Sequence, residues 1–463
     1  VYVSDRAKFA SALAAAVPPA AEVIDRSTFG TLTSVTSGPE VDFRHQAIQP
    51  DHTAKILFTS GSTGAPKGVI NTHRMLCSNQ QMILQTLPFL GDAPPILVDW
   101  LPWHHTFGGN HNLGIVVYNG GSLHIDDGRP LPGAFAESVR CLREVVPTMY
   151  LNVPKGFEEL VRVLDGDRAL AGRFFSTVQV LFYAAASLSQ HVSDELERLA
   201  LETCGERLVL VTGLGSTETA PMAICRPWAS EVSSAIGLPV PGVEARLAPV
   251  AQKLEMRVRG PNVTPGYWRQ DALTRAAFDD EGFYCMGDAV RAVDSQALAK
   301  GLMFDGRIKE DFKLSTGTWV SVGPLRARVV THFAPYIRDA VIAGHDRDDV
   351  GLLLVPDVDA CRTLAPDLPA DAPAHLVVGH AAVRRCVRER LRTLAAAATG
   401  SASRPRRAIV LETPPSLDAG EVTDKGSLNQ RAVLDCRPAL VEALYADDPS
   451  AAVIAADEPV VEC

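Results

Sequence analysis

Short apolar runs alternate with amphipathic stretches through most of residues 1–300. A short continuous apolar run is typical of a buried strand, whereas apolar residues three or four positions apart are typical of a helix. The pattern predicts strands at residues 56–58, 96–98, 122–125, 148–151, 178–183 and 208–212. It predicts helices between them, for example at residues 134–145 and 189–201. This alternation favours an α/β fold with a largely parallel sheet, in which functional loops follow the carboxyl ends of strands.

The pattern changes twice further along the chain. Residues 255–260 alternate between polar and apolar, which is typical of a half-exposed strand, and turn residues become frequent there. A third pattern begins after residue 306, with predicted strands at 340–343, 351–355 and 408–411. We therefore predict two domains. The large layered domain consists of an α/β region, residues 1–250, and a β-rich subdomain, residues 251–305. A small α+β C-terminal domain, residues 306–463, follows it.

The start of the chain reads as the interior of a βα repeat. Residues 1–3 and 22–24 have the composition of strands, and residues 6–17 between them have that of a helix. From this pattern we expect that the large domain is incomplete at its start and that an N-terminal portion precedes residue 1.

Composition narrows the class of protein. The 463 residues are 46% hydrophobic and 21% charged, which is ordinary for a globular protein of two or three domains. A net charge of −10 argues against a nucleic-acid scaffold. Nine scattered cysteines without a Cys-x-x-Cys pair suggest a reduced, cytoplasmic enzyme. Apolar runs stay short of the roughly 18 residues that a membrane helix needs.

Residues 59–68 read Thr-Ser-Gly-Ser-Thr-Gly-Ala-Pro-Lys-Gly directly after a predicted strand. Glycines let backbone N–H groups approach phosphate oxygens, and hydroxyls and a lysine add donors, so the run suits a polyphosphate. It is not the common P-loop, because its lysine precedes a glycine and not Ser or Thr. The alternative is an exposed Gly/Ser linker. The candidate phosphate-binding residues are Thr59, Ser60, Gly61, Ser62, Thr63, Gly64 and Lys67.

Two further strand ends carry candidate ligand-binding segments. Residues 213–219, Gly-Leu-Gly-Ser-Thr-Glu-Thr, follow the predicted strand at 208–212, and Glu218 offers a carboxylate of the kind that Mg²⁺ binds. Such a turn taken by itself is more often structural. Ala184, Ala185 and Ala186 follow the strand at 178–183, where small side chains allow a flat ligand or a tight helix–sheet contact.

These segments, taken in order with Tyr-x-x-Gly-Asp at 284–288 and Gly-Arg at 306–307, resemble the signatures of the adenylate-forming enzymes: acyl-CoA synthetases, luciferases and adenylation domains. The resemblance implies an ATP site in which Ala184–Ala186 lie along adenine and Glu218 holds Mg²⁺. It implies that Asp288 accepts from both ribose hydroxyls and that Arg307 faces the ribose. The resemblance further implies that Gly213, Leu214, Gly215 and Ser216 bind the nucleotide. It implies a catalytic role for Thr217. Leu214 stands where the family usually has an aromatic residue.

The resemblance also implies a mobile C-terminal domain. Lys425 matches the catalytic lysine that bridges the attacking carboxylate and the α-phosphate, although a lysine in a polar loop is most often a surface residue. Lys309 matches the hinge about which this domain rotates after the acyl-adenylate has formed, so that the acceptor thiol can enter. Lys313 matches a lysine associated with that adenylate. His105, in Trp-His-His-Thr-Phe-Gly-Gly at 103–109, is the candidate nearest the acid. A zinc site with His104 and His111 is the weaker alternative.

Residues 103–112, 312–325 and 424–433 further resemble the feruloyl-CoA synthases, and the likeness extends over about residues 54–434. It implies a ligase that joins ferulate and related hydroxycinnamates to coenzyme A, with ATP and Mg²⁺ as cofactors. Alternatives are a fatty acyl- or other aryl-CoA ligase, an adenylation domain that loads a carrier protein, and a non-catalytic ATP-binding remnant. The expected partners are small molecules, without nucleic acid or membrane, and a homodimer is left open.

Overall fold

The computed structural model describes residues 1–59, 66–130, 133–186, 188–230, 234–250, 252–416, 418–423, 428–446, 448 and 450–457. Contacts between these residues divide the chain into two compact units, Val1–His52 and Thr53–Cys463. In the described part of the chain, no helix is long and apolar enough to cross a membrane.

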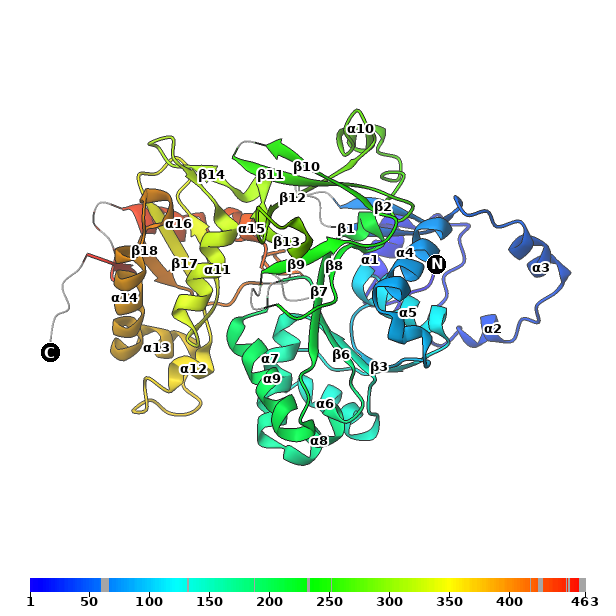
Figure 1. The fold of residues 1–463 in the computed structure, drawn as a ribbon, viewed down its shortest axis with the longest axis horizontal. Helices are drawn as coiled ribbons and strands as arrows, with labels where there is room; N and C mark the ends of the chain where they lie inside the picture. Colours follow the sequence, from blue (N-terminus) through cyan, green and yellow to red (C-terminus); the bar gives the residue numbers. More distant parts are fainter. Residues whose placement is uncertain are drawn as a thin grey trace. The chain divides into compact units, whose positions relative to one another are not determined.

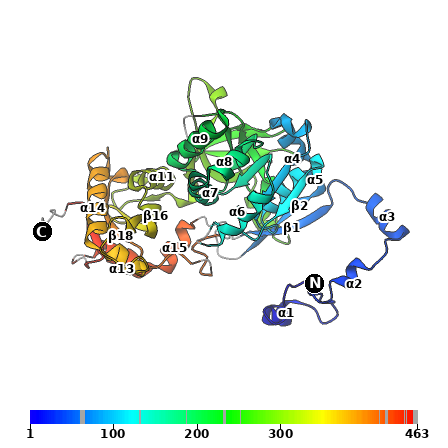
Figure 2. The ribbon, with the colours of Figure 1, turned by 90° about the horizontal axis from the view of Figure 1, so that it is seen from below.

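The first unit contains three short helices: α1 (Ala10–Ala16), α2 (Gly30–Thr33) and α3 (Pro39–Gln46). Tyr2 and Ile24 form an isolated parallel bridge between the two stretches predicted as strands, and α1 between them is shorter than the predicted helix at residues 6–17. The described helices of this unit bury none of their side chains. Figure 2 shows them joined by extended connections.

The second unit is a layered α/β structure (Figure 1). The predicted fold class is confirmed. Its strands are β1 (Thr53–Thr59), β2 (Lys67–Thr72), β3 (Ile96–Asp99), β4 (Ser122–Ile125), β5 (Met149–Asn152), β6 (Val180–Tyr183), β7 (Val209–Gly215), β8 (Met222–Arg226), β9 (Ala235–Pro239), β10 (Glu244–Val250), β11 (Lys253–Arg259), β12 (Tyr284–Ala292), β13 (Leu302–Arg307), β14 (Phe312–Lys313), β15 (Trp319–Val320), β16 (Ile337–Ala343), β17 (Val350–Pro356), β18 (Pro405–Val410) and β19 (Val453–Ala455).

The helices of this unit fall between the strands. They are α4 (His73–Thr86), α5 (Leu113–Asn119), α6 (Phe135–Glu144), α7 (Pro154–Gly166), α8 (Arg168–Phe175), α9 (Gln190–Cys204), α10 (Asp271–Ala276), α11 (Val322–Phe333), α12 (Val358–Arg362), α13 (Ala374–Gly379), α14 (Ala381–Ala396), α15 (Gln430–Cys436) and α16 (Pro438–Tyr445). Short 3₁₀ and π segments are η1 (Pro88–Gly91), η2 (Phe107–Asn112), η3 (Thr217–Thr219), η4 (Leu298–Lys300), η5 (Ile308–Glu310) and η6 (Ser401–Ser403).

Nine of the described strands form one mixed sheet, in the order β10-β11-β12-β13-β9-β8-β7-β6-β5. Strands β5, β6 and β7 are parallel, whereas every other neighbouring pair in this sheet is antiparallel. The expectation of a largely parallel sheet is therefore wrong for the sheet as a whole. The chain reverses after β7, where η3 and a tight turn lead directly into β8, and β10–β13 then extend the same sheet as hairpins.

Two apolar clusters lie on opposite faces of β5–β7. One contains Leu181 and Tyr183 and packs beneath α6–α9, which cover that face (Figures 1 and 2). The other contains Phe182 and Val211 and packs against α4, α5 and η2. Alternate residues of each strand point to opposite faces, so these buried runs are continuously apolar.

Residues 312–456 build a separate sheet, β16-β17-β18-β19, with its own apolar clusters. Strand β17 is buried along its whole length between α11 and α14 on one side and α15 and α16 on the other. That this region is an independent small domain remains a prediction.

Candidate active site

The predicted phosphate-binding run lies in a hairpin. Thr59 ends β1 and Lys67 begins β2, and the two residues are paired across the antiparallel ladder. Residues Ser60, Gly61, Ser62, Thr63 and Gly64 of this run lie outside the described part of the chain. The hydroxyl of Thr59 is buried and has no hydrogen-bond partner among the described residues. A donor of this kind at the mouth of the hairpin suits an anionic ligand.

Lys67 and Glu218 meet at the centre of the site. The Lys67 ammonium is 2.7 Å from Glu218 Oε1, and it also donates to the hydroxyl of Tyr267 at 2.8 Å. That hydroxyl donates in turn to the same carboxylate oxygen at 2.9 Å, and Lys67 Nζ lies 4.3 Å from the Tyr267 ring centroid. The side chain of Glu218 is 6% exposed and that of Lys67 is 23% exposed. The structure therefore brings together two residues that the sequence predicted and one that it did not.

The charges of this cluster stabilise each other. Burial is the largest single effect on Glu218 and raises its pKa, but the Lys67 ammonium, with hydrogen bonds from the backbone and from Tyr267, outweighs burial, so the pKa of this carboxyl is below its ordinary value. Burial likewise has the largest single effect on Lys67 and lowers its pKa, but Glu218 and Tyr267 together outweigh it and the pKa is raised. Glu218 is therefore ionised at neutral pH, and an ionised carboxylate is a ligand that Mg²⁺ accepts.

The turn after β7 is fixed by close backbone packing. A Cβ at Gly215 would lie 1.7 Å from the carbonyl oxygen of Pro221, and one at Gly213 would lie 2.4 Å from that of Ile224. Both glycines are thus needed where β8 returns against β7. Glu218 lies in η3, whose backbone is tied to its neighbours because the Thr264 N–H donates to the Glu218 carbonyl at 2.8 Å.

The other predicted residues of this turn lie around the same point. Leu214 is half-buried in the sheet and packs against the apolar cluster of β8–β13. Ser216 precedes η3, and its N–H donates to the Thr219 hydroxyl at 2.9 Å. Thr217 is buried in η3, and its carbonyl accepts from the Asn71 side chain at 3.3 Å.

The Ala184–Ala186 segment leaves the same edge of the sheet. The strand residues Asn152, Tyr183 and Thr212 are paired across β5, β6 and β7, and the alanines follow Tyr183 directly. Ala185 and Ala186 are exposed, and Ala185 has a φ of 80°, which a residue with a Cβ rarely adopts. Strained backbone of this kind clusters at ligand sites.

Asp288 and Arg307 face each other across β12 and β13. They are paired in the ladder, and Arg307 Nε is 3.6 Å from Asp288 Oδ1. The Asp288 side chain is buried while Arg307 remains largely exposed. Burial raises the pKa of Asp288 to about 6, although the guanidinium of Arg307 opposes this shift.

The predicted hinge is a short 3₁₀ turn, η5, between extended residues. Lys309 lies in its middle. Asp311 follows it and forms a buried ion pair with Lys253 at 2.6 Å, and its other carboxylate oxygen accepts from the Val322 N–H at the start of α11. Lys313 lies in β14, with its ammonium 5.1 Å from the Trp319 ring centroid.

The aromatic motif forms an unusual helical turn. Residues Phe107–Asn112 form the π-helix η2, a conformation frequent at functional sites. His105 precedes it, and its Nδ1 accepts from the Phe107 N–H at 3.1 Å. His111 is buried with its ring centroid 4.8 Å from that of Phe182, and burial lowers its pKa to about 4.

Lys425 lies outside the described residues. The loop before it is held by Arg437, which is paired with Glu421 at 2.5 Å and donates to the carbonyls of Thr413 and Pro414. Glu421 also accepts from the Ser416 N–H at 2.8 Å.

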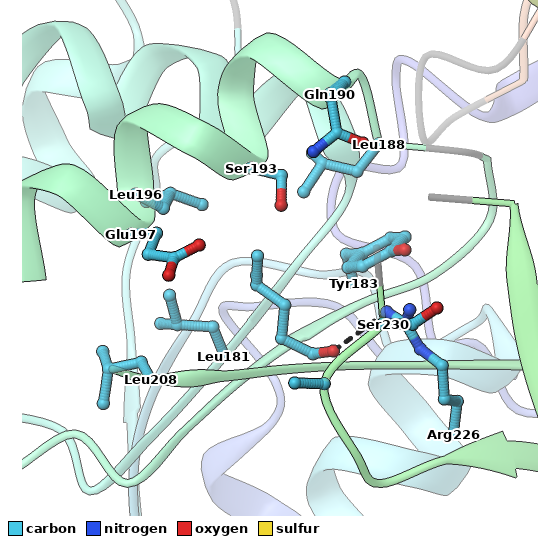
Figure 3. A pocket seen from close by; sticks show the side chains of 12 residues that line it. Leu181, Tyr183, Leu188, Gln190, Ser193, Leu196, Glu197, Leu208, Arg226 and Ser230 are labelled. Carbon is cyan, nitrogen blue, oxygen red and sulfur yellow. Dashed lines mark hydrogen bonds between the residues drawn. The ribbon is translucent and has the colours of Figure 1, made fainter. Parts of the chain in front are cut away.

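A small pocket lies between α9 and the face of β6 and β7 that α9 covers (Figure 3). Leu181, Leu188 and Leu196 line its apolar part, and Tyr183 and Arg226 close one end. Arg226 Nη2 donates to the carbonyl of Leu210 at 3.1 Å. Its leucines and Tyr183 belong to the apolar cluster under α6–α9, and its lining includes none of the predicted nucleotide, metal and catalytic residues.

Comparison with known proteins identifies the family of this chain. The model of the family described as AMP-binding enzyme matches residues 2–268, more than half of the chain, so the chain belongs to the AMP-binding enzyme family. An ATP-bound crystal structure of MatB from Rhodopseudomonas palustris has a TM-score of 0.70 to this chain at 20% identity, covering 95% of this chain and 79% of MatB. That likeness shows the fold.

Two curated relatives show the range of substrates named in the family. The chain is 22% identical over 434 residues to the long-chain-fatty-acid–[acyl-carrier-protein] ligase AEE15 of Arabidopsis thaliana, with 77% of this chain and 58% of the relative covered. It is 27% identical over 301 residues to the anthranilate–CoA ligase of Pseudomonas aeruginosa, with 62% and 52% covered. The chain thus spans little more than half the length of these relatives.

Proposed function

We propose that this chain is an AMP-forming acid–thiol ligase that uses ATP, Mg²⁺ and coenzyme A. The single observation that carries the proposal is the Lys67–Glu218 pair, which places a cation from the phosphate-binding hairpin beside an ionised, buried carboxylate. A site of this kind can hold both a polyphosphate and the cation that accompanies it.

In the first step, a carboxylate oxygen of the acid bonds to the α-phosphorus of ATP, and the bond to pyrophosphate breaks. Lys67 and the hairpin bind the phosphates, Asp288 and Arg307 hold the ribose, and Ala184–Ala186 with Leu214 contact the adenine. Glu218 is the residue that would hold Mg²⁺, which when bound offsets charge on the phosphates. Lys425 bridges the two anions that must approach each other.

In the second step, the thiol sulfur of coenzyme A bonds to the acyl carbon of the adenylate and the thiol proton is released to water. The bond from that carbon to the phosphate oxygen breaks, and AMP leaves with the bonding electron pair. The proposal requires the region after Lys309 to rotate between the steps, so that Lys425 withdraws and the thiol enters. Extended residues on both sides of η5 are suited to absorb such a change.

We further propose that the acid is ferulate or a related hydroxycinnamate. The sequence resemblance to feruloyl-CoA synthases supports this choice, and so does the anthranilate specificity in the name of one relative, since anthranilate is also an aromatic acid. His105 and Phe107 belong to the aromatic motif that we propose lies nearest the acid, and the rings of His111 and Phe182 contact that of Phe107. The competing substrate is a long-chain fatty acid, which the name of the Arabidopsis relative favours.

The test is product formation with a panel of acids. Pyrophosphate and acyl-CoA are measured with ferulate, coumarate, caffeate, benzoate and octanoate, each with and without coenzyme A. We expect the hydroxycinnamates to give the highest kcat/KM and acyl-CoA to form only with coenzyme A present. A higher kcat/KM for octanoate would replace the aromatic acid with a fatty acid.

A further inference from the structure

Tyr267 belongs to none of the motifs that the sequence suggested, yet it contacts the two charged groups at the centre of the site. Its hydroxyl accepts from Lys67 at 2.8 Å and donates to Glu218 at 2.9 Å. The Lys67 ammonium also lies 4.3 Å from the ring centroid, a distance at which a cation is attracted to an aromatic ring. Three groups from distant parts of the chain thus form one closed cluster.

The backbone around Tyr267 is fixed by its neighbours. The residue forms an antiparallel bridge with Val69, two positions after Lys67 in β2. The Trp268 N–H donates to the carbonyl of Gly68 at 2.8 Å, and the Ile70 N–H donates to that of Gly266 at 3.1 Å. The backbone of Tyr267 is therefore paired with the strand that carries Lys67, and this pairing fixes the point from which its side chain extends toward the cluster.

Glu218 is equally fixed, whereas Lys67 is not. The Glu218 backbone is bonded to Thr264, three residues before Tyr267, and its side chain is buried. The Lys67 side chain is more exposed than that of Glu218, and it is long and flexible. When a phosphate attracts the ammonium, Lys67 is the group that moves. Among the described residues, the Tyr267 hydroxyl then stays on Glu218, beside the Tyr284 hydroxyl, which also faces this carboxylate.

We propose that Tyr267 is a positioning residue that holds Lys67 and Glu218 as a mutually neutralising pair, and that it keeps Glu218 hydrogen-bonded when a nucleotide attracts Lys67 away. This inference rests on the proposed function, since it assumes that Lys67 binds phosphate. A buried carboxylate that loses its cation is strongly destabilised. A divalent cation that arrives with the nucleotide replaces the lost charge, so metal and nucleotide binding are coupled through this cluster.

The coupling is measurable as a ratio. Calorimetry gives the Kd of ATP in excess EDTA and in excess Mg²⁺, without acid or coenzyme A. The ratio of the Kd in EDTA to the Kd in Mg²⁺ reports how strongly ATP binding depends on the cation. The Tyr267 hydroxyl should have its largest effect on ATP binding when no cation is present. In Tyr267→Phe the ratio should therefore rise about tenfold, the effect of one hydrogen bond to a charged group.

Tyr445→Phe is the matched control. The Tyr445 hydroxyl also makes hydrogen bonds, one of them to the carbonyl of Asp349 at 3.2 Å, and arginines lie over its ring, but it lies beside β17 and outside the cluster. Its ratio should equal that of the wild type. An unchanged ratio in Tyr267→Phe, or the same change in both variants, would overturn the proposal, because a purely structural role alters both Kd values equally.

Glu218→Gln tests the same idea in the opposite direction. The neutral amide carries no charge to be left uncompensated, so its ratio should fall below that of the wild type. If circular dichroism shows that Tyr267→Phe does not fold, Glu218→Gln is the deciding variant. A ratio in Glu218→Gln equal to that of the wild type then overturns the proposal. A wild type that does not bind ATP at all overturns the proposed function as well. One that binds ATP but gives equal ratios in all variants overturns only the role of Tyr267.

Discussion

At the scale of single residues, the site depends on contacts between parts of the chain that are far apart. Lys67 and Glu218 are 151 residues apart, and Tyr267 is 200 residues from Lys67. Local motifs identify Lys67 and Glu218, because a glycine-rich strand end is visible in the sequence. Tyr267 follows an ordinary Pro-Gly turn, and nothing in its local pattern shows that it lies beside a buried carboxylate. Its role could be found only from the three-dimensional structure.

Asp288 gives a prediction for pH dependence. A carboxylate accepts from both ribose hydroxyls, whereas a protonated carboxyl does so less well. Because burial raises the pKa of Asp288 to about 6, the group is ionised above that pH and becomes neutral below it. We expect the Kd of adenosine, which has no titrating phosphate, to be constant above about pH 7 and to rise as the pH falls through about 6.

The control for this prediction is Asp288→Asn, which cannot titrate. Adenosine should bind it more weakly, and its Kd should not change between pH 5 and 8. If the variant keeps the pH dependence of the wild type, another group is responsible and Asp288 does not contact the ribose.

At the scale of elements, the sequence predicted the positions of the strands better than it predicted whether neighbouring strands are parallel or antiparallel. The predicted strand at 122–125 coincides with β4, and those at 96–98 and 178–183 overlap β3 and β6. Apolar runs of this kind reveal that a strand is buried, but not the direction of its neighbour. The reversal between β7 and β8 depends on how closely two backbones approach at Gly213 and Gly215, which a hydrophobic pattern does not show.

This close approach predicts the effect of adding one methyl group. In Gly215→Ala the new Cβ would meet the Pro221 carbonyl oxygen at 1.7 Å, so the β7–β8 turn must shift. We expect the free energy of unfolding to fall by at least about 2 kcal/mol in urea titrations. Gly172→Ala is the comparison, because a Cβ there meets no atom within 4 Å and the residue is inside α8. That variant should be more stable than the wild type by about 0.5–1 kcal/mol. Equal stability of the two variants would contradict the packing described.

At the scale of the whole molecule, the proposed reaction needs residues from both ends of the second unit. Lys67, Glu218 and Asp288 belong to the hairpin, the β7–β8 connection and the nine-stranded sheet, whereas Lys425 lies in the sequence between β18 and β19 of the four-stranded sheet formed within residues 312–456. Among the described residues, the apolar clusters of the four-stranded sheet draw their members from residues 312–456, and those of the nine-stranded sheet draw theirs from residues 82–304. Separate cores are consistent with our proposal that residues 306–463 form a small domain that moves as one body.

Lys425→Ala should separate the two steps. The variant should lose adenylate formation by at least about 100-fold, since a cation that stabilises the transition state is removed. It should still convert a chemically prepared feruloyl-adenylate to feruloyl-CoA at close to the rate of the wild type. Rapid-quench measurements of each half-reaction distinguish these rates, and an equal loss in both would contradict the assigned role.

The central claim is that an acid displaces pyrophosphate from ATP in this site. Its most direct test is the exchange of labelled pyrophosphate into ATP, measured without coenzyme A. We predict that label enters ATP only when both Mg²⁺ and a hydroxycinnamate or another carboxylic acid are present, and that the rate saturates with the acid. If wild-type protein that binds ATP incorporates no label with any aromatic or aliphatic acid, the account is wrong.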